Sequence, residues 1–182
     1  MRLAAAVICA MAVSGCTASP TEPTPVTSTP MTPRPTEPPP VTRTLDVNQH
    51  RGKPCALLDG DEQVSLEAPP LSHEGQLDCE FEKWQPVHTQ IVIQLSPEND
   101  VLRSAYLNSN QTIWQQFQPV SIAGQPAVIR SLGKTGQNLT CEVVVGAGPS
   151  QGVTVSAAGM DGSVDWCGKA RAAAEFVLSH LG

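Results

Sequence analysis

The chain has 182 residues, enough for one domain or at most two small ones, and only 4% of them are aromatic, so aliphatic side chains must supply most of any core. The formal net charge is −6, and from residue 46 onward 8 Lys and Arg stand against 15 Asp and Glu. No basic stripe is visible, which argues against nucleic acid and against electrostatic docking on anionic lipid.

The first residues have the features of an export signal. Arg2 supplies a positive charge, and 3–13 is an apolar run too short to span a bilayer as a helix. The letters VSGC at 13–16 then place small residues directly before a cysteine, as in a bacterial lipobox. We expect 1–15 to be a lipoprotein signal peptide and Cys16 to be the lipidated first residue of the mature protein. The alternative is a plain secretory signal with an incidental cysteine.

A low-complexity segment follows the cysteine. Residues 17–45 hold nine Pro and eleven Ser or Thr and show no apolar periodicity. Such a composition buries too little surface to offset the entropy of folding, and proline favours an extended chain. We therefore expect 16–45 to be a lipidated cysteine followed by a disordered Thr/Pro-rich tether, and 46–182 to be a single domain. The protein would lie on the extracytoplasmic face of the cell membrane, held by its lipid.

Four cysteines remain in the expected domain: Cys55, Cys79, Cys141 and Cys167. An even number in an exported chain predicts two disulfides, for which three pairings are possible. We prefer Cys55–Cys79 and Cys141–Cys167, because each closes a loop of about 25 residues between adjacent elements and contributes about 3 kcal/mol in the loop-entropy model. Metal binding is the alternative. The sequence has no C-x-x-C motif and no histidine at ligand spacing from a cysteine, so we expect no metal.

Short helices and strands are expected in the first half of the domain. A helix is also expected from Ser96, as its N-cap, with Pro97 in the first position. In chain order, the elements before it are a short helix at 54–58, its continuation at 61–66, a loop at 67–76, and strands at 77–84 and 87–95.

Two hairpins and a long helix are expected in the second half. The hairpins pair 117–122 with 127–131 and 139–145 with 152–158. The helix runs from about 165 to 181, and its apolar residues form one stripe. They are Ala170, Ala173, Ala174, Val177, Leu178 and Leu181. The expected fold is α+β, an antiparallel β-sheet packed with a C-terminal helix and two shorter helices and held by two disulfides.

Several short motifs occur in a fixed order around the cysteines: PCALL at 54–58, CEF at 79–81, CEV at 141–143, and Cys167 followed by KAR at 169–171. Together with the lipobox and the Thr/Pro tail, this set resembles the actinobacterial lipoproteins grouped as domain of unknown function 3558. The resemblance implies an exported lipoprotein domain with paired cysteines, and it implies no catalytic residues. A weaker resemblance, to the two-disulfide extracellular sensor domains of some mycobacterial kinases, implies ligand sensing.

One motif suggests catalysis. Residues 148–152 read G-x-S-x-G around Ser150, and Asp165 and His180 follow in the order of a hydrolase triad. A nucleophile elbow requires a helix after the serine, whereas here a β-branched strand follows it directly. We therefore expect no enzymatic activity, and an envelope serine hydrolase that uses Ser150, Asp165 and His180 is the competing hypothesis.

Trp84, Trp114 and Trp166 have two interpretations, because tryptophans line ligand pockets as well as cores. The function that we expect is that of an envelope binding or accessory protein anchored to the membrane. Its partner would be a hydrophobic small molecule, a cell-wall component or another exported protein, without a cofactor. A purely structural or assembly subunit is the third hypothesis.

Overall fold

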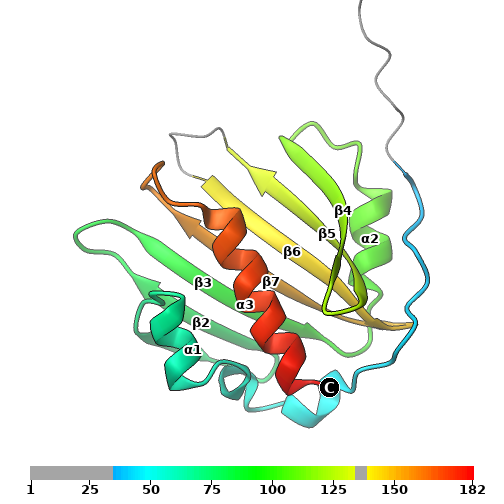
Figure 1. The fold of residues 1–182 in the computed structure, drawn as a ribbon, viewed down its shortest axis with the longest axis horizontal. Coiled ribbons are helices and arrows are strands. Elements are labelled where there is room, and N and C mark those ends of the chain that lie inside the picture. Colours follow the sequence, from blue (N-terminus) through cyan, green and yellow to red (C-terminus); the bar gives the residue numbers. More distant parts are fainter. Residues whose placement is uncertain (1–34, 134–138) are drawn as a thin grey trace, which may run out of the picture. The chain divides into compact units, whose positions relative to one another are not determined.

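The computed structural model describes residues 35–133 and 139–182, and these form one antiparallel sheet with helices on both sides (Figure 1). The sheet has seven strands in the order β1-β2-β3-β7-β6-β5-β4, and every neighbouring pair is antiparallel. The strands are β1 (Leu71–Glu74), β2 (Asp78–Lys83), β3 (Thr89–Ser96), β4 (Gln116–Ile122), β5 (Gln125–Leu132), β6 (Leu139–Gly148) and β7 (Gln151–Gly159). The helices are the 3₁₀ turns η1 (Val47–His50) and η2 (Pro54–Leu57), and α1 (Gly60–Ser65), α2 (Val101–Leu107) and α3 (Trp166–His180). The expected α+β fold with a C-terminal helix is confirmed.

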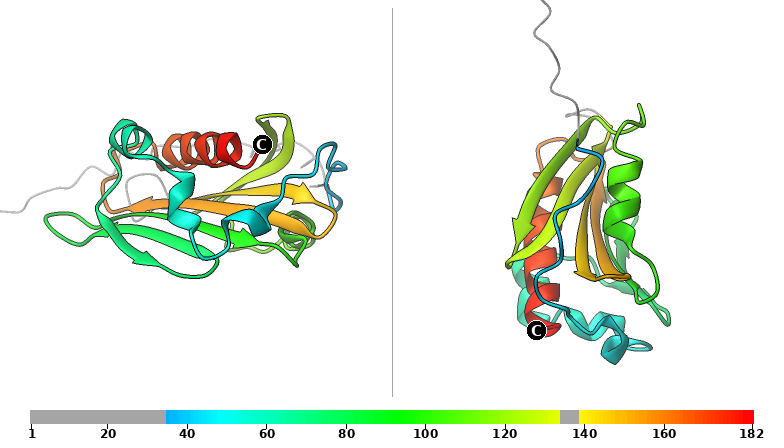
Figure 2. Two further views of the ribbon diagram at one scale, coloured as in Figure 1. Left: turned by 90° about the horizontal axis from the view of Figure 1, so that it is seen from below. Right: turned by 90° about the vertical axis from the view of Figure 1, so that its right-hand side faces the viewer.

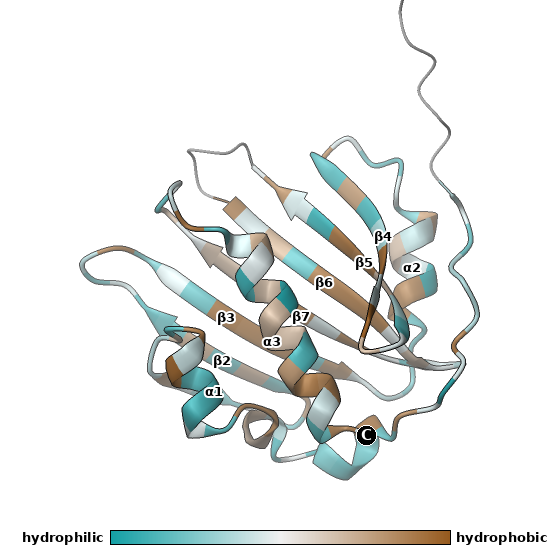
Figure 3. Ribbon diagram, viewed as in Figure 1, coloured by the Kyte–Doolittle hydropathy of each residue, from teal (hydrophilic) through white to brown (hydrophobic). Residues whose placement is uncertain are grey.

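Helix α3 covers the central strands. It begins at its N-cap Asp165, whose carboxylate accepts a hydrogen bond from the Gly168 amide. The predicted apolar stripe, from Ala170 to Leu181, is buried throughout. Beneath it, alternate residues of the central strands, such as Ile93 and Val155, have no exposed surface. The resulting alternation of apolar and polar residues along the strands is visible in Figure 3.

Helix α2 lies on the other side of the sheet, so the sheet is the middle layer (Figure 2). Its Leu102, Ala105 and Tyr106 are buried against Val128 of β5 and Val144 of β6. Burial raises the pKa of the Tyr106 phenol, because desolvation disfavours its charged form. Because α2 has only 7 residues and packs on β5 and β6, it covers only one corner of this side of the sheet.

Two local predictions in the first half of the domain are wrong. The stretch expected as a loop at 67–76 contains β1, an edge strand whose four residues are all exposed. Because neither side of this strand is buried, its sequence lacks the alternation of apolar and polar residues that predicts a strand. The helix expected at Ser96 does not begin there, because Ser96 is the last residue of β3 and pairs with Gly152. Asp100 is the actual N-cap of α2, and its carboxylate accepts from the Arg103 amide.

Residues 38–45 run along the end of the sheet, and we call them the N-terminal strap. The Leu45 amide donates to the carbonyl of Ala147 at 2.7 Å, and the buried Gln125 side chain donates to the carbonyl of Arg43 at 2.8 Å. Leu45 itself is 2% exposed. The packed part of the chain therefore starts before the boundary expected between residues 45 and 46, because Leu45 and Val41 supply apolar surface that the Thr/Pro-rich composition hides.

We expect Leu45→Ala to lower the free energy of unfolding by about 3 kcal/mol, since a fully buried leucine loses both its transfer energy and its packing. Urea denaturation of the full chain measures this, with the exposed Thr42→Ala as the matched control. An equal midpoint for the two variants would show that the strap contributes nothing to the stability of the domain.

Candidate functional site

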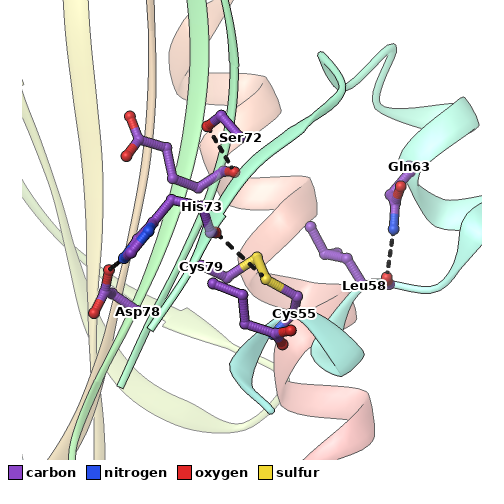
Figure 4. The surroundings of a disulfide bond; sticks show 9 residues. Cys55, Leu58, Gln63, Ser72, His73, Asp78 and Cys79 are labelled. Atoms are coloured by element: carbon purple, nitrogen blue, oxygen red, sulfur yellow. Dashed lines mark hydrogen bonds and ion pairs between the residues drawn. A yellow bond between two sulfur atoms is a disulfide. The ribbon is translucent and has the colours of Figure 1, made fainter. Parts of the chain in front are cut away.

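The cysteines pair as preferred from their spacing, Cys55 with Cys79 and Cys141 with Cys167. The first bond ties η2 to β2, and the second ties β6 to the start of α3. Around the first bond, the sulfur of Cys55 lies 3.7 Å from the carbonyl oxygen of His73 in β1 (Figure 4). The disulfides thus fix the η2 turn and the covering helix α3 to the sheet.

The predicted lipidation site, Cys16, lies outside the described residues. Within the ranges 35–133 and 139–182, no helix combines the length and the apolar character needed to cross a bilayer.

The three residues of the hydrolase hypothesis lie far apart. Ser150 is in the tight turn before β7, and Asp165 lies beyond the other end of that strand, whose nine residues span about 30 Å. His180 ends α3, and Asp165 caps its start, so the 15 residues of the helix, about 22 Å, separate the two. Asp165 is engaged as an N-cap. No catalytic triad forms from these residues.

His180 instead joins a cluster at α1. Its Nε2 lies 3.1 Å from the carboxylate of Glu62, and Asp59 completes a group of potential metal ligands within 4.8 Å. Asp59 and Glu62 already form a capping box, each carboxylate accepting from the other residue's backbone amide. The cluster therefore closes the start of α1 and ties it to the end of α3, a contact across 118 residues that no local pattern predicts.

The side of the sheet opposite α3 is left uncovered beyond α2, and we call this surface the open face. Figure 2 shows no helix over β2 and β3 on this side among the described residues. Alternation along the strands gives it polar side chains that are half-buried. They are Glu80, Glu82, Gln90, Thr140, Glu142, Thr154 and Ser156.

One hollow of about 250 Å³ lies on the open face beside α2, and we call it the α2 hollow. In its lining, Arg130 Nε donates a hydrogen bond to Glu142 Oε2 at 2.7 Å, and Arg130 Nη2 lies 2.7 Å from the same oxygen. The Arg130 guanidinium also lies 4.0 Å from the centre of the Trp114 ring, as a cation–π contact. The pair is four-fifths buried and mutually neutralised, so this hollow has hydrogen-bonding groups but little net charge. The rest of its lining is Gln94, Val101, Ser104, Ala105, Asn108, Val144 and Thr154.

A second hollow of about 210 Å³ lies at the other end of β3, and we call it the Trp84 hollow because one of its lining residues, His88, stacks on Trp84. His88 lines it and stacks on Trp84, with ring centroids 4.3 Å apart and planes inclined by 29°. His88 Nε2 is 3.0 Å from Glu82 Oε1, which fixes the imidazole in place. The remaining lining residues are Gln90, Leu139, Thr140, Ala158, Gly159 and Met160.

The three tryptophans divide between the two interpretations. Trp114 and Trp166 are 9% and 3% exposed and belong to the interior, whereas Trp84 is 66% exposed. Trp84 directly follows β2, and it is placed beside Glu82 through His88, which stacks on Trp84 and contacts Glu82. That no helix covers it, and that His88 supports it, depends on tertiary packing and was missed.

A family model described as "Protein of unknown function (DUF3558)" matches residues 11–180. The chain belongs to this family. The DUF3558 match spans both disulfides and the open face, and it also includes Cys16. No curated protein and no solved structure matches the chain.

Proposed function

We propose that this DUF3558 chain is an exported, lipid-anchored protein of the cell envelope that binds its partner through the open face. The observation that carries the proposal is the pair of disulfides in a chain that also has a lipobox at 13–16. Structural disulfides persist in oxidising compartments and are rare in the reducing cytosol. Export explains why a domain of this size uses both bonds.

A lipid on Cys16 would supply two or three acyl chains, and each buried CH₂ contributes about 0.8 kcal/mol, so anchoring is stable where one chain is marginal. The strap meets the sheet at Ala147, beside the turn that joins β6 to β7. The Trp84 hollow lies at the opposite end of these strands, about 30 Å away. A domain held from the strap end thus leaves the Trp84 end accessible, which supports binding there.

Cys16→Ser tests the anchor. We expect this variant to lose labelling by a palmitate analogue and to move from the detergent phase to the aqueous phase in a detergent-partition assay, since position 16 then carries no thiol to be acylated. Cys9→Ser is the matched control, because Cys9 lies in the expected signal peptide and is removed with it. Equal labelling of the Cys16→Ser and Cys9→Ser proteins would refute the lipoprotein proposal.

A further inference from the structure

We propose that the open face binds a neutral glycan chain, with one sugar ring stacked on Trp84. The inference rests on the proposed function, for which it names the partner class. A glycan of the cell wall is a partner that an anchored envelope domain meets at high local concentration.

Trp84 is built as a platform. Its indole is 66% exposed, and the ring of His88 stacks on it at 4.3 Å. Glu82 holds His88 in turn through the 3.0 Å contact to Nε2. A rigid aromatic surface loses little entropy when a ligand covers it, and burying it removes a large apolar area from water. The C–H side of a sugar ring is flat and apolar and fits such a surface.

The groups around the platform suit hydroxyls. Gln90 and Thr140 line the Trp84 hollow beside His88. Thr140 supplies a hydroxyl and His88 its second ring nitrogen, whereas the amide of Gln90 also donates to Glu80. A hydrophobic small molecule is instead held by walls that are predominantly apolar. The polar groups of the lining therefore favour a ligand with many hydroxyls over a hydrophobic small molecule.

The two hollows lie on one line. Gln90 lines the Trp84 hollow and Gln94 lines the α2 hollow, both on the same side of β3 and four residues apart, which is about 13 Å. Ser156 of β7 stands between them, opposite Val92. A ligand that reaches both hollows is a chain of sugar units rather than a single sugar.

Charge excludes the anionic polymers. Glu80 and Glu82 face this side of β2, and the charge of Arg130 is already matched by Glu142. Among the described residues, no other Lys or Arg lines either hollow. The glutamates would repel a polymer that carries phosphates or carboxylates, and no unpaired cation would compensate. A neutral glycan meets no such electrostatic repulsion.

The test uses the full-length lipidated protein purified in detergent, with acrylamide quenching of tryptophan emission as the readout. Trp84 is the exposed member of the three, so its protection reports ligand on the platform. The probes are cellohexaose, chitohexaose and mannohexaose as neutral chains, hexagalacturonate as an anionic chain, and wall polysaccharide extracted from the producing cells. We expect protection by at least one neutral probe and none by hexagalacturonate.

Variants assign the site. We expect Trp84→Ala to weaken binding, measured by calorimetry, by about tenfold, and Trp84→Phe to retain most of the affinity. Val64→Ala is the control, because Val64 is 77% exposed on α1, on the side of the sheet that carries α3, and it should bind normally.

Each other result overturns the inference. No binding of any neutral probe would do so, as would equal binding by the Trp84→Ala and Val64→Ala proteins, or equal binding of hexagalacturonate. Self-association that Trp84→Ala abolishes would assign the platform to a second copy of the chain. The intact mass of the same sample reports acylation of Cys16, so a failure of glycan binding is distinguished from a failure of the lipoprotein proposal.

Discussion

Trp166→Ala should lower the free energy of unfolding by about 4 kcal/mol, the largest effect that we expect from one substitution in this chain. The indole is 3% exposed at the first turn of α3, and its Nε1–H donates to the carbonyl of Asp161 at 3.0 Å. Truncation removes the apolar burial, leaves a cavity under the helix, and leaves the Asp161 carbonyl without this donor. Urea denaturation followed by circular dichroism measures the change.

Gly159 provides the internal control for this prediction. A Cβ at this position would overlap the ring of Trp166, so Gly159 is required for the indole to lie on β7. We expect Gly159→Ala to destabilise the native chain by about 2 kcal/mol, and to cost much less when Trp166 is already Ala. Strictly additive losses in the double variant would show that the indole does not rest on Gly159.

Removing the second disulfide is the other large effect. Cys141 and Cys167 are 26 residues apart in sequence, and we expect their joint replacement by Ala to lower the free energy of unfolding by about 3 kcal/mol. The bond ties β6 to α3, so its loss frees the helix from its strand in the unfolded chain as well as in the native one. Guanidinium denaturation of the non-reduced proteins gives the value.

The first disulfide offers the comparison. Cys55 and Cys79 are 24 residues apart, so the loop-entropy model predicts a loss of nearly the same size, about 3 kcal/mol. Unchanged stability in either pair variant would contradict the role given to that bond. The reduced native protein should behave like the variant that lacks both bonds.

The core of this fold was predictable because its signals are local or covalent. The stripe on α3 has the period of a helix, and every residue predicted for it is buried. The cysteine pairing followed from loop length and adjacency alone. Both hairpins of the second half also form as expected, because β5, β6 and β7 are largely buried and therefore apolar.

What failed depends on tertiary context. β1 has four exposed residues, so no apolar period marks it, and only the neighbouring β2 makes it a strand. Ser96 carries good helix-cap chemistry, but its pairing with Gly152 keeps it in β3. For the candidate site, the sequence left Trp84 with two interpretations, because the part of the sheet that stays uncovered is decided by the shortness of α2 and by where it packs.

The most direct test of the account is the intact mass of the protein extracted from the membranes of an expressing bacterium and measured without reduction. The account predicts a chain that starts at Cys16, carries a diacylglycerol and a further acyl group, and has lost the four hydrogens of two disulfides. A chain that starts elsewhere without lipid, or one that retains free thiols at the four domain cysteines, would contradict it.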